Sequence, residues 1–114
     1  MDALTPLTYS ILVAVADAPR HGYGIIKELE ERTGPGSAPS TGALYLALQR
    51  MEAEGLIEEA KKRPRRAEQG ADDARRRYWS LTHRGREAAR TESRRLAAVL
   101  AAARKKDLLA RDPA

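Results

Sequence analysis

The sequence predicts a mainly α-helical fold with a small β component: a three-helix core, a two-stranded hairpin and one long C-terminal helix. Apolar residues recur at helical spacing in four segments. Two short runs with strand character, 56–63 and 76–81, flank a stretch of proline, glycine, alanine and charge. A chain of 114 residues, 42% hydrophobic, can bury one modest core, so we expect these elements to share it.

The composition narrows the class of protein further. The chain has no cysteine, which excludes disulfides and thiolate metal sites and fits a reducing cytoplasm. The acidic Asp2 and the lack of a positive region before the first apolar stretch argue against a signal peptide. No apolar run approaches the roughly 20 residues of a membrane span. We therefore expect a cytoplasmic protein that does not enter a membrane.

The first helix is predicted to begin at Thr5-Pro6, with threonine as N-cap, and to end at Ala18-Pro19. It is apolar on nearly all sides, so we expect it to be buried on nearly all sides. In a chain this short, a second subunit is the simplest cover for the second apolar face. The residues assigned to that interface are Leu7, Ile11, Leu12 and Val15.

A second helix is predicted from His21 to about Arg32, with core contacts from Ile25, Ile26 and Leu29. The glycine- and proline-rich residues 33–39 then form a loop. His21 is interpreted as a helix-start residue.

Residues 40–57 carry the most information. Ser40 suits an N-cap, and Gly55 closes the helix in a left-handed conformation. On a helical wheel, Leu44, Leu48 and Met51 form a core stripe. The opposite side is small at its N-terminal end and bears side chains that donate hydrogen bonds. Helix, loop and helix followed by a hairpin predict a winged helix-turn-helix.

In the second strand of this wing, Trp79 and Leu81 are expected on one face and Tyr78 and Ser80 on the other. Trp79 is interpreted as a core residue that holds the wing in place.

The last helix is predicted from His83, capped by Thr82, to about Leu109. Its narrow apolar seam has little to bury against its own domain, so we expect it to pair with a second chain. The sequence thus divides into a domain at 1–82 and a dimerisation helix with a frayed tail at 83–114. The seam residues assigned to the interface are Leu96, Val99, Leu100 and Ala103.

The net charge of +5 is concentrated in one segment. Residues 61–86 hold ten lysines and arginines against three acidic residues, or +7, so the rest of the chain sums to −2. A basic segment directly after a two-faced helix indicates a polyanion partner, here double-stranded DNA.

Direct readout of bases needs donors and acceptors on a helix that fits the major groove. Gln49 can bond adenine, Leu46 can touch a thymine methyl, and Tyr45 can reach a phosphate. Tyr45 could instead be a core tyrosine, and Arg50 could pair with Glu54 at i+4. The candidate DNA-binding residues are Ser40, Thr41, Gly42, Tyr45, Leu46, Gln49 and Arg50 on the helix, and Arg65, Arg66, Arg75, Arg76 and Arg77 in the wing.

The sequence gives no basis for catalysis, a metal site or a cofactor. His21 and His83 are far apart and have no ligand pattern around them, and the glycine pairs are isolated. The first and last helices carry aliphatic side chains and Tyr9. They contain no aromatic cage that would indicate an effector site.

Three segments together resemble the PadR family of bacterial transcriptional regulators, over roughly residues 4–90. They are His21-Gly22-Tyr23-Gly24-Ile25, Gly42-Ala43-Leu44-Tyr45 through Gly55-Leu56-Ile57, and Arg77-Tyr78-Trp79-Ser80-Leu81-Thr82 with Gly85-Arg86. The family usually has proline where this chain has Leu46, and its wing loop is typically shorter and less basic. The resemblance implies a winged-helix homodimer, usually a repressor that binds an operator, sometimes released by a small hydrophobic effector.

We therefore expect a sequence-specific DNA-binding regulator that associates with the nucleoid when bound. Two alternatives stay open: a nonspecific nucleic-acid-binding protein that uses the basic wing, and a protein-interaction module that pairs through its last helix.

Overall fold

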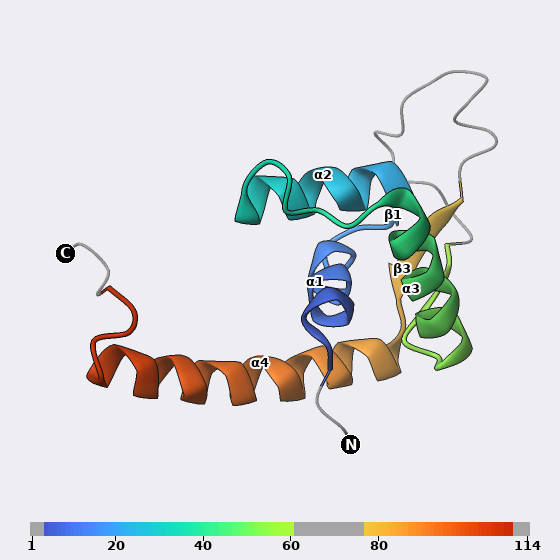
Figure 1. The fold of residues 1–114 in the computed structure, drawn as a ribbon. Coiled ribbons are helices and arrows are strands. Elements are labelled where there is room, and N and C mark those ends of the chain that lie inside the picture. Colours follow the sequence, from blue (N-terminus) through green and yellow to red (C-terminus); the bar gives the residue numbers. More distant parts are fainter. Residues whose placement is uncertain (1–3, 61–76, 111–114) are drawn as a thin grey trace.

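The computed structural model describes residues 4–60 and 77–110 (Figure 1). The elements in chain order are α1 (Pro6–Ala14), β1 (Arg20–His21), α2 (Gly22–Thr33), α3 (Thr41–Ala53), β2 (Ile57–Glu59), β3 (Tyr78–Leu81) and α4 (His83–Lys105). The predicted fold class, mainly α with a β-wing, is confirmed.

Short-range capping starts the helices where the sequence predicts. The side chains of Thr5, Ser40 and Thr82 each accept a hydrogen bond from a backbone N–H three residues later. These bonds satisfy donors that the first helical turn leaves free. His21 caps α2 in the same way, because its Nδ1 accepts from the Gly24 N–H at 3.0 Å.

Two helices end earlier than predicted. The first ends at Ala14 rather than Ala18, because the Nε of Arg20 donates to the Ala14 carbonyl at 2.7 Å and satisfies it without a further turn. The last ends at Lys105 rather than Leu109. There Asp107 has a φ of 61°, and the Leu108 N–H returns to the Ala103 carbonyl at 2.8 Å, which closes the helix in a left-handed turn.

The sheet has three antiparallel strands in the order β1-β3-β2, one more than the predicted hairpin. Its register pairs Arg20 with Trp79 and Ile57 with Leu81. Tyr78 is buried as Trp79 is, although adjacent strand residues point to opposite faces of the sheet. The His21 ring of β1 packs edge-on against the Tyr78 ring, with centroids 5.3 Å apart, and covers that face.

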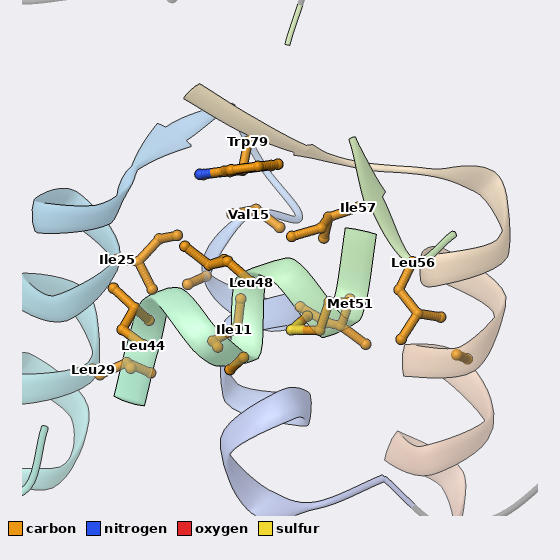
Figure 2. Packing of buried hydrophobic residues seen from close by; sticks show 14 residues of the cluster. Ile11, Val15, Ile25, Leu29, Leu44, Leu48, Met51, Leu56, Ile57 and Trp79 are labelled. Atoms are coloured by element: carbon orange, nitrogen blue, oxygen red, sulfur yellow. The ribbon is translucent and has the colours of Figure 1, made fainter. Parts of the chain in front are cut away.

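The core lies where α1, α2 and α3 meet the sheet (Figure 2). Leu44, Leu48 and Met51 of α3 are buried as predicted, and Trp79 lies over them from β3. The cluster is completed by Ile11, Leu12, Ala14, Val15, Ile25, Leu29, Ala47, Leu56, Ile57 and Ala88.

This core corrects part of the interface assignment. Ile11 and Leu12 have no exposed surface and Val15 has 2%, so their own subunit already covers them. Helices from both sides enclose α1, because α2, α3 and α4 all contact it. An apolar first helix therefore does not require a partner, and these three residues belong to the subunit core. Leu7 remains only half-buried.

A compact joint connects α3, the wing and α4. Gly55 has a φ of 78°, which favours glycine and turns the chain into β2. The Thr82 hydroxyl donates to the Gly55 carbonyl at 2.6 Å, and the Thr82 N–H to the Leu56 carbonyl at 3.2 Å. A Cβ on Gly85 would lie 2.0 Å from the Leu56 oxygen, so α4 can approach Leu56, the residue before β2, this closely only with glycine there.

The two faces of α3 give a stability test. Leu48→Ala should lower the free energy of unfolding by about 2–5 kcal/mol, since it leaves a cavity in the core. Leu46→Ala is the matched control, because Leu46 is 65% exposed on the same helix and its truncation should cost within about 0.5 kcal/mol. Chemical denaturation measures both. Equal losses would mean that the orientation of α3 is wrong.

Candidate nucleic-acid interface

The outer face of α3 is exposed along its length. Tyr45 is 46% and Leu46 65% exposed, whereas Leu44 and Leu48 on the inner face have no exposed surface. The predicted contact residues that share the exposed side are Ser40, Thr41, Gly42, Tyr45, Leu46, Gln49 and Arg50. The helix thus presents hydroxyl, amide, guanidinium and apolar groups together, the chemistry with which a helix reads base edges and phosphates.

Gly42 lies at the start of this face, and no contact within the subunit requires glycine there. A Cβ there would meet nothing within 4 Å, and its φ is not in the left-handed region. Alanine is the better helix former. The missing side chain leaves room at the start of α3 for another molecule to approach the helix backbone.

Arg50 is available for an external contact. Within the described residues it forms no ion pair with Glu54, the alternative that its i+4 spacing left open.

The wing arginines divide into two groups. Arg65, Arg66, Arg75 and Arg76 lie outside the described residues. Arg77 stands at the root of the wing with its side chain 54% exposed, 3.2 Å from Glu59 and 3.9 Å from Glu52. Its guanidinium also lies 4.6 Å from the centre of the Trp79 ring. Arg77 therefore covers the core tryptophan. Its positive charge is partly neutralised by Glu59 and Glu52.

The sequence reasoning missed an exposed aromatic group at the start of α2. Tyr23, in the first turn of α2, is 60% exposed. The His21 ring stacks on it at 6.3 Å, and the Lys27 ammonium lies 5.7 Å from its centre. The signal was present in the sequence, since Tyr23 falls on the side of the helical wheel opposite to the core residues Ile25 and Leu29.

A second exposed surface follows α4, whose C-terminal half extends past α1 (Figure 1). Val99 is 54% and Leu100 44% exposed, and Leu96 and Ala103 are half-buried. At helical spacing, Leu96, Leu100 and Ala103 continue the line of Ala89 and Ser93. Ala89 and Ser93 in turn line a groove between α1 and α4, together with Val13, Ala16, Leu81, Arg86, Arg90 and Arg94.

The N-terminal half of α4 is attached to the start of the chain. The Tyr9 and Ser93 hydroxyls lie 2.7 Å apart, and the buried Glu92 carboxylate accepts from the Leu4 N–H at 3.4 Å. Arg95 donates to both carboxylate oxygens of Glu92. These hydrogen bonds from Arg95 lower the pKa of Glu92 below its ordinary value of 4.5, although burial opposes them.

Other classes of site find little support in the same residues. In ranges 4–60 and 77–110, no three His, Asp or Glu side chains gather as a metal site would require. None of the helices described there has the length and apolar character of a membrane-crossing segment.

Comparisons with known proteins give a consistent result. The family model of the transcriptional regulator PadR-like family matches residues 11–91. A PadR family transcription regulator from Clostridium difficile R20291 superposes with a TM-score of 0.71 at 24% identity, over 89% of this chain and 97% of that one. A PadR-like transcriptional regulator from Bacillus cereus gives 0.71 at 22%, over 91% and 93%. A search of curated protein sequences found no match.

The Glu92 contacts predict a pH-dependent contribution to stability. Because its pKa is lower in the folded chain, the carboxylate stabilises the fold fully above pH 4.5, and this contribution disappears as the pH falls through the folded value. Glu92→Gln should therefore lower the melting temperature at pH 7, and the gap to the wild type should narrow in acid.

The matched control is Glu87→Gln on the same helix, where the Glu87–Arg90 pair is exposed. Exposed pairs contribute little, so its melting temperature should stay close to that of the wild type. If Glu92→Gln lowers the melting temperature as much at pH 3 as at pH 7, the lowered pKa of Glu92 is contradicted.

Proposed function

This chain belongs to the transcriptional regulator PadR-like family, and we propose that it is a homodimeric, sequence-specific repressor that reads operator DNA with the outer face of α3. Family membership makes it a DNA-binding regulator, in a family whose members are generally not enzymes. The finer assignments below are our proposal.

The two-faced character of α3 carries the proposal. Its inner face is fixed in the core by Leu44, Leu48 and Met51, so the outer face is held rigidly relative to the rest of the domain. That rigidity matters because a reading helix must be held in one orientation for its side chains to meet particular base edges.

Each outward residue then has a role that suits its chemistry. Gln49 bonds an adenine in two places, Leu46 contacts a thymine methyl, and Thr41 reaches a base or a phosphate. Ser40 and Gly42 sit at the helix start, where backbone N–H groups favour a phosphate. Tyr45 and Arg50 contact the backbone of the duplex from the flanks of the helix.

The wing supplies the electrostatic part of binding. The +7 charge of residues 61–86 matches a phosphate backbone or a narrow minor groove. We assign this role to Arg65, Arg66, Arg75 and Arg76. Arg77 makes a smaller contribution, because Glu59 and Glu52 already neutralise it in part.

The apolar line of α4 is the proposed dimer interface. Leu96, Val99, Leu100 and Ala103 are separated by alanines at 97, 98, 101 and 102, on a helix that has no other described element beside its C-terminal half. We assign residues 83–114 to dimerisation and 1–82 to DNA binding, in a protein that acts in the cytoplasm. The groove between α1 and α4 has no aromatic side chain in its lining, so we assign no effector.

The Gln49 role is tested by binding to single-base variants of a duplex selected from a random library. Gln49→Ala should relax the preference at one position in each half-site, since a good bidentate base contact discriminates by about 1–3 kcal/mol. The two half-sites should lie about one helical turn apart, ~34–36 Å.

Tyr45→Phe is the comparison variant. A phosphate contact carries no base identity, so this variant should weaken binding to all duplexes alike. Unchanged base preferences in Gln49→Ala would exclude direct readout by Gln49. Equal affinity of the wild type for all sequences would favour the nonspecific alternative.

The dimer is tested by placing charge in the apolar line. The double variant Val99→Glu, Leu100→Glu should be monomeric at micromolar concentration, because two carboxylates would be buried without partners. Leu46→Glu, an equally apolar-to-acidic change on α3, should leave the oligomeric state unchanged. Analytical ultracentrifugation measures both, and a double variant that stays dimeric would place the interface elsewhere.

A further inference from the structure

Tyr45 of α3 packs against the first residue of α2. A Cβ built on Gly22 would lie 2.7 Å from the Tyr45 hydroxyl oxygen and 3.1 Å from its Cζ atom. The next neighbour, a Leu44 methyl group, would be at an ordinary 3.6 Å. The space that a side chain would need at position 22 is thus taken by the end of the Tyr45 ring.

The backbone itself does not require glycine at this position. The positive φ values of the described residues occur at Gly34, Gly36, Gly55 and Asp107, and Gly22 is not among them. The reason for glycine at position 22 is therefore the ring of Tyr45.

The clash would involve the far end of a side chain that is 46% exposed. Such a ring can turn towards solvent, so an added methyl group would move Tyr45 and leave the core in place. The fold tolerates this movement, whereas a contact made by the hydroxyl depends on where the ring points, because hydrogen bonds weaken steeply with misalignment.

We infer that Gly22 is a positioning residue for DNA binding: it lets the Tyr45 ring lie against α2 in the orientation that contacts the phosphate backbone. The inference rests on the proposed function, since it takes the Tyr45 contact with DNA as its premise. It also links α2 to the interface, where the exposed Tyr23 follows Gly22 directly and Lys27 lies one turn further along.

The experiment is a double-mutant cycle on the full chain, with the duplex selected by the wild type as the probe. Gly22→Ala and Tyr45→Ala should each weaken affinity by roughly three- to tenfold per half-site, the range of one hydrogen bond. The double variant should bind no more weakly than Tyr45→Ala alone, because no ring is left to displace.

Gly24→Ala is the matched control. It adds the same methyl group to the same helical turn, where the nearest atom, His21 Cε1, would be 3.5 Å away. It should bind DNA like the wild type. Gly22→Ala should melt no lower than the wild type, and its crystal structure should show the Tyr45 ring turned outwards. A merely structural role would instead lower the melting temperature.

Gly22→Ala that binds as tightly as the wild type, or whose effect adds fully to that of Tyr45→Ala, would overturn the inference and leave the proposed function standing. A wild-type chain that selects no duplex would overturn both. A ring that keeps its position in Gly22→Ala would also overturn the inference.

Discussion

The close approach of α4 to Leu56, the residue before β2, is the constraint on which the rest of the structure depends. The Leu56 carbonyl accepts the Thr82 N–H, and the helix that starts at His83 passes so near that only glycine fits at position 85. The Thr82 side chain has two tasks there, since it donates to the Gly55 carbonyl and accepts from the Gly85 N–H. Thr82 thus connects the residues that follow α3, at the start of the wing, with the first turn of α4.

This joint has a functional consequence. Residues 61–76 separate the two wing strands in the sequence. Next to the joint, Ile57 of β2 nevertheless pairs with Leu81 of β3 in a fixed register. The orientation of α3 relative to the wing and to α4 is therefore set in the core, away from the exposed face. In the proposed function, the same joint fixes how the reading helices of two subunits are spaced once α4 pairs.

Local features were predictable because they depend on residues close in sequence. The caps at Thr5, Ser40 and Thr82 and the stripe of α3 each follow from spacing within a few residues. Strand β1 was not, because two residues carry no periodic signal and form a strand only by pairing with Tyr78 and Trp79.

The predictions for the candidate site failed where they depend on residues far apart in the sequence. An apolar first helix fits a subunit core as well as an interface, and only the positions of α2, α3 and α4 decide that Ile11 and Leu12 are internal. The contact between Gly22 and Tyr45 joins two motifs of the sequence analysis that spacing alone could not bring together. Exposure of Gln49 and Leu46, in contrast, follows directly from the burial of their neighbours on the helix.

The central claim is that the outer face of α3 is the surface that meets DNA. The most direct test is a titration of ¹⁵N-labelled protein with a duplex selected by the wild type, followed by amide chemical shifts. We expect the largest changes at Thr41, Gly42, Tyr45 and Gln49, with small changes over Val99–Ala103. Shifts confined to the α4 line, with the α3 amides unmoved, would contradict it.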